Sequence, residues 1–323
     1  MVHSGLLKEV FSVDYFLSVR GRQGDGYSNR MGGAKYLAVP ETAGTYSKSH
    51  EIRATQWVRD VQAAAGATAQ EKGHIVVFVH GFNTDQWDML ERHRKIRKGL
   101  ESQGFKGVVI SYDWPSDGSV LGYTSDRRDA RRSADLLFSN GITRLSKLQT
   151  ADCDYNIHVL AHSMGAYLVR EAFDYADDDH VTAQKSWTVS QVALVAADTS
   201  SKSMKAGNSK TSSLLRHSTR VTNYYSPFDE VLSVSEVKRI GVSRRLGRVG
   251  MPQDRAEKAV NLYCGRFFND NRAGFGDGTA ITHSWYFDAP RFYEDLFHTV
   301  MGKLDREVIP TRGRTDQGNL ALV

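Results

Sequence analysis

The chain has 323 residues, and its 42 Lys and Arg against 37 Asp and Glu give a net charge of +5. Hydrophobic residues make up 40% and charged residues 24%, as in ordinary globular proteins, and the 28 glycines and 6 prolines exclude collagen-like and proline-rich disordered classes. Two cysteines, Cys153 and Cys264, are too few for a disulfide scaffold, and we expect both to be reduced thiols.

The apolar stretches are too short to cross a membrane. The longest aliphatic run, 192–197, falls far short of the roughly 18 residues that a transmembrane helix needs. Residues 1–9 carry charge where a signal peptide would have its apolar core. We therefore expect a cytoplasmic protein without a membrane span.

Positive charge gathers at 92–98 and at 127–132. The second stretch lies on a helical pattern with Ala130, Ala134 and Leu137 facing inward, which indicates a solvated helix face. A nucleic-acid-binding surface would need the excess charge to be concentrated. We expect no nucleic-acid partner, and the oligomeric state stays open.

From about residue 74 onward, apolar β-type runs alternate with helical patterns. The run 74–80 is apolar at nearly every position, which is typical of a buried strand in a parallel sheet with helices on both faces. Further strands are predicted at 107–112, 156–160, 189–197, 220–225 and 260–264, the last of the sheet. One helix is predicted to begin at a capping box of Asn83 and Gln86 and to end at Gly104. Three more helices are predicted, at 125–148, 164–176 and 285–301.

This alternation predicts one α/β domain over 1–304, built on a mostly parallel, doubly wound sheet. The first 70 residues differ, with predicted strands at 13–19 and 34–39 around a glycine-rich turn and a helix at 52–61. That layout suits an antiparallel N-terminal edge joined to the parallel sheet. Residues 305–323 are polar and unpatterned, and we expect a mobile tail.

A Ser-x-Gly pattern begins at Ser116, Ser139 and Ser163, and only Ser163 lies between an apolar strand and an apolar helix. A serine at such a sharp turn has its hydroxyl exposed, and the residues two before and two after it must be small. Ala161 and Gly165 meet this need, with alanine where glycine is usual. The alternative interpretation is a serine that caps the helix.

A serine nucleophile needs a base and an acid, which on this kind of sheet follow it in the order Ser, Asp or Glu, His. Seven of the 11 histidines precede Ser163, and His180, His217 and His298 are disfavoured by their positions. His283 remains as the base, after a stretch at 269–280 that we expect to be flexible. A helix-cap or surface histidine is the alternative interpretation.

Two aspartates follow strands after the serine. Strand order favours Asp229 as the acid, because it comes one strand later than Asp198, the alternative acid. The carboxylate would hold the imidazole in one tautomer. An N-cap is the other interpretation of either residue. We expect the backbone N–H groups of Met164 and Phe82 to form an oxyanion hole, in a loop that His80 helps to shape.

Six stretches together resemble the α/β-hydrolase superfamily, and within it a bacterial esterase/lipase-like family of unknown function. They are 77–84 (VFVHGFNT), 114–116 with 122–123, 160–165 (LAHSMG), 196–198, 226–232 (SPFDEVL) and 283–287 (HSWYF). The resemblance implies the α/β-hydrolase fold, with Ser163 as nucleophile, Asp229 as acid and His283 as base. It implies no substrate, since this fold hosts many chemistries.

The sequence thus predicts a serine esterase that cleaves a small-molecule carboxylic ester or thioester through an acyl-enzyme, with no metal or other cofactor. The alternative is a catalytically silent binding or scaffold protein of the same fold. The acidic run 177–180 is interpreted as a solvated helix end rather than a metal site. The polar segment 200–213 lies where such hydrolases often carry a lid, and its role stays open, as do the substrate's acyl and alcohol groups.

Overall fold

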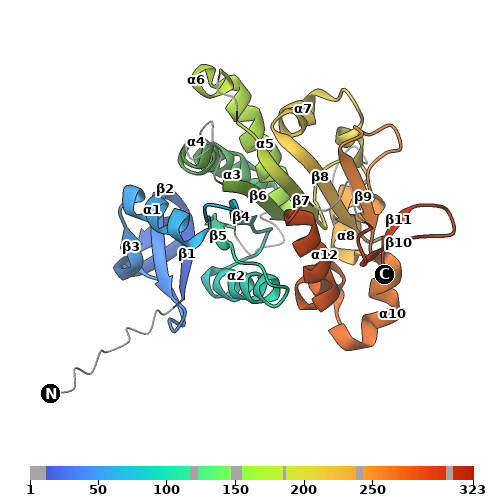
Figure 1. The fold of residues 1–323 in the computed structure, drawn as a ribbon, viewed down its shortest axis with the longest axis horizontal. Helices are drawn as coiled ribbons and strands as arrows, with labels where there is room; N and C mark the ends of the chain where they lie inside the picture. Colours follow the sequence, from blue (N-terminus) through green and yellow to red (C-terminus); the bar gives the residue numbers. More distant parts are fainter. Residues whose placement is uncertain (1–11, 117–122, 147–154, 185–186, 238–242, 303–307) are drawn as a thin grey trace.

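A computed structural model describes residues 12–116, 123–146, 155–184, 187–237, 243–302 and 308–323, so Cys153 and Gly122 lie outside the described part. Within it, eleven strands form a single sheet (Figure 1). The strands are β1 (Val13–Gln23), β2 (Gly26–Pro40), β3 (Glu51–Ile52), β4 (Gly73–Val79), β5 (Val108–Asp113), β6 (Tyr155–His162), β7 (Val189–Val195), β8 (Ser218–Tyr225), β9 (Ala259–Tyr263), β10 (Arg312–Arg314) and β11 (Leu320–Leu322).

Twelve α-helices surround the sheet in the described ranges. They are α1 (Ala54–Ala64), α2 (Gln86–Glu101), α3 (Tyr123–Leu136), α4 (Thr143–Ser146), α5 (Met164–Asp178), α6 (His180–Ala183), α7 (Ser209–Arg216), α8 (Glu230–Val237), α9 (Leu246–Val249), α10 (Gly265–Phe275), α11 (Thr279–Ser284) and α12 (Pro290–Val300). No helix among the described residues is long and apolar enough to traverse a bilayer.

The sheet runs in the order β10-β11-β9-β8-β7-β6-β4-β5-β1-β2-β3. Neighbouring strands from β9 to β1 pair in parallel, whereas β1, β2 and β3 pair antiparallel at the N-terminal edge. The predicted α/β class, a mostly parallel sheet with an antiparallel N-terminal edge, is therefore confirmed. The six predicted parallel strands from 74 onward are each present, with ends displaced by at most two residues.

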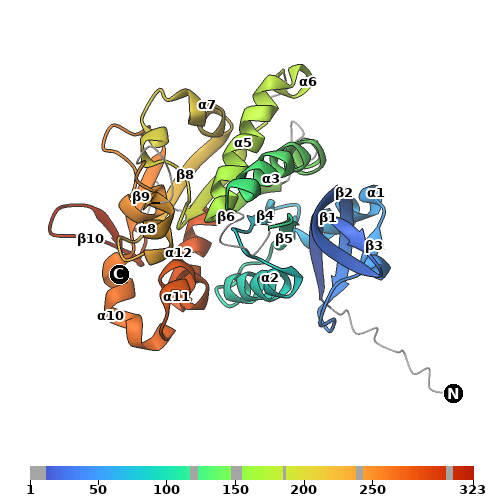
Figure 2. The ribbon, with the colours of Figure 1, turned by 180° about the vertical axis from the view of Figure 1, so that it is seen from behind.

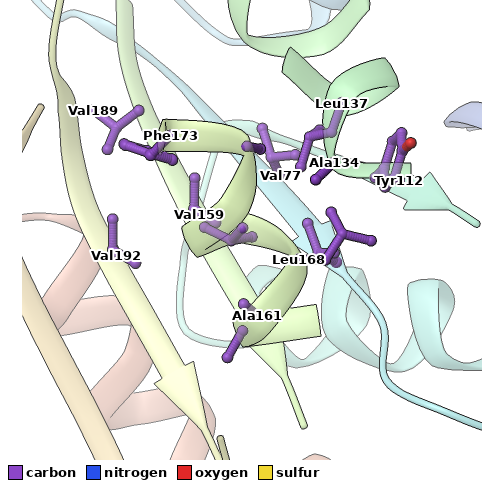
Figure 3. Close-up of a cluster of buried hydrophobic side chains, with 14 of the residues drawn as sticks. Val77, Tyr112, Ala134, Leu137, Val159, Ala161, Leu168, Phe173, Val189 and Val192 are labelled. Carbon is purple, nitrogen blue, oxygen red and sulfur yellow. The ribbon is translucent and has the colours of Figure 1, made fainter. Parts of the chain in front are cut away.

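Strand β4 shows why its apolar run is almost unbroken. Ile75, Val77 and Val79 pack on one face of the sheet, and Val76 and Phe78 on the other, and all five are buried. Helices α1, α3, α5 and α7 cover the first face, and α2, α10 and α12 cover the second (Figures 1 and 2). Figure 3 shows the first layer, in which Val77 and Val159 of the sheet meet the side chains of α5.

The order in which successive strands are added to the sheet reverses at β4. Strand β4 pairs with β5 on one side and with β6 on the other, so the chain passes from β5 back across β4 to reach β6. In sheets of this type the loops at the carboxyl ends of two such strands diverge and leave a crevice between them. The loops after β4 and β6 are therefore where a ligand site is expected.

Buried charge ties the N-terminal edge to this region. The Nε of Arg20, on β1, donates to Asp113 at the end of β5 at 2.7 Å, and its Nη2 donates to the carbonyl of Thr84 at 2.6 Å. Ser18 and Tyr46 each donate to the other carboxylate oxygen of Asp113 at 2.8 Å. Burial by itself raises the pKa of Asp113, but the charge of Arg20 brings it well below its usual value.

Two expectations about helices are corrected. Helix α2 is capped by Asp85, whose carboxylate accepts from the N–H of Asp88 at 2.8 Å. Asn83 lies earlier, in the left-handed region at φ 54°, and the Gln86 side chain donates instead to the carbonyl of Tyr46 at 3.2 Å, so the expected capping box does not form. The stretch 269–280, expected to be flexible, is largely helical, because Phe268 and Phe275 of α10 pack on Trp285.

The described part of the C-terminal segment is not an unpatterned tail, and β9 is not the last strand. β10 and β11 form a hairpin whose second strand pairs in parallel with β9. Arg312 donates to the buried carboxylate of Asp295, on α12, at 2.6 and 2.7 Å, and Thr311 donates to the same group at 2.7 Å. Ala321 and Leu322 are buried, so these few apolar side chains and one ion pair attach the segment to the sheet.

The Arg20–Asp113 pair leads to a prediction about stability. Arg20→Met leaves a buried carboxylate without its cation, and we expect the free energy of unfolding to fall by about 3–5 kcal/mol. Arg22→Met is the matched control two residues along, because the Arg22 side chain is 55% exposed and water screens its pair with Glu51. Urea unfolding of both variants gives the comparison, and equal losses would contradict it.

Candidate active site

Ser163 lies in a strained turn between β6 and α5. Its backbone has φ 54° and ψ −122°, a conformation that residues other than glycine rarely adopt. Its N–H donates to the carbonyl of Val195 at 3.0 Å, and its own carbonyl accepts from the N–H of Asp198 at 3.0 Å. The hydroxyl makes no capping hydrogen bond to α5, so the helix-cap interpretation does not describe this serine.

Small residues surround this turn because there is no room for larger ones. A Cβ atom on Gly165 would lie 2.4 Å from the carbonyl oxygen of Val79 and 2.5 Å from that of His80. A Cβ atom on Gly81 would lie 2.7 Å from the Cβ of Ser163 itself. The turn after β6 therefore packs directly against the end of β4 and the loop that follows it.

His283 and Asp229 are in contact. The Nδ1 of His283 lies 2.7 Å from Oδ2 of Asp229, and both residues are buried. The other carboxylate oxygen accepts from the N–H of Leu232 at 2.9 Å, which fixes the carboxylate at the start of α8. With Asp229 as the acceptor, Nδ1 of His283 carries the proton and Nε2 keeps its lone pair.

His283 is held from its backbone side as well. It lies in helix α11, and its carbonyl oxygen is 3.1 Å from Nε2 of His162. The two imidazole rings lie 4.7 Å apart, centre to centre. Burial, together with the nearby charge of Arg92, holds the pKa of His162 well below its usual value, so this ring is neutral and donates through Nε2.

Asp198, the alternative acid, occupies a different place. Its carboxylate lies 3.1 Å from Nε of Arg245, and both side chains are buried. Its N–H is the donor that holds the carbonyl of Ser163. Of the two aspartates, Asp229 is the one for which the structure shows a contact with His283.

His80 has both ring nitrogens engaged with the loop after β4. Its Nδ1 donates to the carbonyl of Gly81 at 2.8 Å, and its Nε2 accepts from the N–H of Trp114 at 3.1 Å. Burial lowers the pKa of His80, which favours this neutral form. The ring thereby positions the backbone around Phe82, one of the two residues expected to supply an oxyanion donor. Met164, the other, is the first residue of α5, where an N–H has no acceptor within the helix.

A cavity of about 510 Å³ brings these groups together at the carboxyl end of the sheet. Ser163 and His283 both line it, as do Gly81 and Phe82. The remaining wall includes residues of α2, α8 and α11, namely Asp88, Arg92, Val231, Leu232, Val234, Thr279 and Ala280. This volume lies within the usual range for small-molecule sites.

Sequence reasoning passed over two residues of the cavity wall. His162 was set aside because it precedes Ser163, and Arg92 was counted with the basic stretch of its helix. The signal for Arg92 is its spacing, since it lies three residues after Met89 and four before Ile96, both buried. A charged residue on the apolar stripe of a helix is a reason to look for a site.

Two other features lie away from the cavity. Among the described residues that line it, none comes from 200–213, a segment whose helix α7 packs on α5 and contributes Leu214 to the core. In the acidic run, Asp177 lies 2.7 Å from Nε2 of His217 and 2.8 Å from a guanidinium nitrogen of Arg216. Within the described ranges, no cluster of His, Cys, Asp and Glu is arranged to hold a metal ion.

A family model described as an alpha/beta hydrolase of unknown function (DUF900) matches residues 59–299 of the chain. An uncharacterized protein of Nostoc sp., alr1448, is 42% identical over 62 residues, which are 19% of this chain and 15% of that protein. The chain therefore matches only a small part of that relative's length.

Among solved structures, a cutinase-like protein from Cryptococcus sp. aligns over 74% of this chain and 97% of its own, with 11% identity and a TM-score of 0.36. Lipase B of Aspergillus fumigatus aligns over 66% and 49%, with 15% identity and a TM-score of 0.34. TM-scores this low give these likenesses no weight for fold or function.

The packing of the turn at Ser163 can be tested by Gly165→Ala. The added methyl group collides with two backbone carbonyls, and we expect a loss of about 2 kcal/mol or more in the free energy of unfolding. Gly44→Ala is the control, because a Cβ there meets nothing within 4 Å. Thermal and urea unfolding would measure both, and a Gly165→Ala protein as stable as the control would show that the turn has room to move.

Proposed function

The chain belongs to the family of alpha/beta hydrolases of unknown function, and from that premise we propose that it is a serine hydrolase acting on carboxylic esters or thioesters. The observation that supports this most is the buried contact between His283 and Asp229, together with the cavity that His283 and Ser163 both line. A serine in a strained turn, an imidazole and a carboxylate are the three groups that acyl transfer needs.

In the first half of the proposed reaction, Nε2 of His283 accepts the proton of Ser163 as Oγ attacks the acyl carbon. The negative oxygen of the tetrahedral intermediate accepts hydrogen bonds from the N–H groups of Met164 and Phe82. The intermediate collapses as His283 returns the proton to the departing alcohol or thiol. The acyl group is then bound to Ser163.

The second half uses the same groups with water. His283 accepts a proton from water as the water oxygen attacks the acyl carbon. The intermediate then collapses, His283 returns the proton to Oγ of Ser163, and the free acid is released. Asp229 keeps the proton on Nδ1 and stabilises the imidazolium that forms in each half. The protein's own residues supply every proton transfer in this sequence.

The nucleophile can be tested with a fluorophosphonate probe, which reacts with activated serines. We expect the folded protein to be labelled and Ser163→Ala to be neither labelled nor active, because the substitution removes only the hydroxyl. Hydrolysis of 4-nitrophenyl esters of graded acyl length gives the parallel activity measurement. Absence of both labelling and hydrolysis in well-folded protein would favour the silent scaffold instead.

The acid can be tested by comparing two isosteric changes. Asp229→Asn removes the acceptor that orients His283, and we expect turnover to fall by roughly three to four orders of magnitude. Asp198→Asn weakens the pair with Arg245, and we expect turnover to fall no more than about tenfold once the folded fraction, measured by circular dichroism, is taken into account. The opposite ranking would assign the acid to Asp198.

A further inference from the structure

Arg92, on helix α2, differs from the neighbouring arginines in its hydrogen-bond partners. Arg94 and Arg97 donate to the buried carboxylate of Asp14, at 2.8 and 3.1 Å. Arg92 precedes them on the same helix, and its Nη1 is buried with no hydrogen-bond acceptor among the described residues. A guanidinium nitrogen that is shielded from water and lacks an acceptor costs free energy, which a ligand that accepts a hydrogen bond from it would recover.

Arg92 also belongs to the cavity of the candidate active site. It lines the same space as Ser163 and His283, and its guanidinium carbon lies 4.3 Å from the centre of the Phe287 ring. The ring of Phe287 meets that of His162 edge to face, with the ring centres 5.2 Å apart, so the contact with Phe287 places the guanidinium near the His162 imidazole. The positive charge is thereby fixed in the wall that a bound substrate would contact.

The carboxylates around Arg92 do not take the place of a ligand. Asp88 and Asp288 act on its charge, but both are exposed to solvent, where water screens them. Asp288 is also paired with Lys95 at 2.6 Å. Burial lowers the pKa of Arg92, but an arginine starts so far above neutral pH that it stays charged.

One part of the wall has the opposite character. Helix α8 contributes Val231, Leu232 and Val234 to the cavity, whereas α2 contributes the buried cation and the exposed carboxylate of Asp88. Such a division fits a substrate with an apolar part and an anionic part on one small molecule. A carboxylate matches the planar donor pair of a guanidinium, with two parallel hydrogen bonds.

On the basis of the proposed serine hydrolase function, we infer that Arg92 determines specificity, and that the preferred substrates are esters that carry a free carboxylate. The carboxylate accepts hydrogen bonds from Arg92 while the ester carbonyl lies at Ser163. Arg92 takes no part in bond making or breaking. Its contribution is to hold one class of ester in the cavity.

The test compares two esters, one with a free carboxylate and one in which a methyl group removes that charge. The 4-nitrophenyl monoester of glutaric acid carries a carboxylate, and in the 4-nitrophenyl ester of monomethyl glutarate that carboxylate is masked. We expect the native protein to favour the charged ester in kcat/KM by on the order of 10- to 100-fold, mainly through KM. A second pair, the butyrates of 4-hydroxybenzoate and of its methyl ester, places the carboxylate on the leaving group instead.

Variants of the same helix then assign the preference to Arg92. Arg92→Met keeps the length of the side chain without its charge, and we expect the charged-to-neutral ratio to fall at least about tenfold, with partial recovery in Arg92→Lys. Lys98→Met removes a positive charge from an exposed position on α2, with a side chain that is 63% exposed, and should leave the ratio as it is. Equal ratios in the native protein and Arg92→Met, with both ester pairs, would overturn the inference.

Fluorophosphonate labelling and a binding measurement separate this inference from the proposed function. If the native protein is labelled at Ser163 but shows no preference for charge, the hydrolase stands and the role of Arg92 is wrong. Binding of monomethyl glutarate, measured by calorimetry, requires no turnover. Binding to the native protein and not to Arg92→Met would support the anion site even if no ester is hydrolysed, and equal binding to both would contradict it.

Discussion

The close packing of two turns is the constraint on which the site depends. The turn after β6 lies so near the loop after β4 that glycine is the only residue that fits at 81 and 165. This packing follows from the reversal of the chain at β4, which makes the two strands neighbours in the sheet. Hydrogen bonds from the end of β7 hold Ser163 on its other side, so the strained backbone is fixed by three adjacent strands.

Buried ion pairs attach the parts of the chain that the parallel sheet does not itself specify. Asp113 takes its partner from β1, Asp198 from the segment before α9, and Asp295 from the C-terminal hairpin. Taking such charges out of water is costly, so each pair adds little net stability compared with apolar packing. Each nevertheless opposes any arrangement that separates its partners, because a lone buried charge costs several kcal/mol.

Much of the framework could be predicted from local patterns. Runs buried on both faces identify parallel strands, and the alternation of strand and helix places Ser163 after β6, Asp229 after β8 and His283 beyond β9. The C-terminal hairpin escaped prediction because β10 and β11 have three residues each, too few for a period to appear. The helical stretch before His283 escaped because its aromatic side chains are ordered by contact with Trp285, not by local propensity.

The sequence by itself determined the type and order of the elements and a short set of candidate side chains, since periodicity and spacing are properties of neighbouring residues. Only the tertiary structure decided which aspartate contacts His283, because residues 229 and 283 are brought together by α8 and α11 and not by the strands that precede them. Only the tertiary structure, likewise, showed that Arg92 differs from the other arginines of α2. Which charge has an acceptor and which is left facing a cavity depends on what packs against each side of the helix, and that information lies far away in the chain.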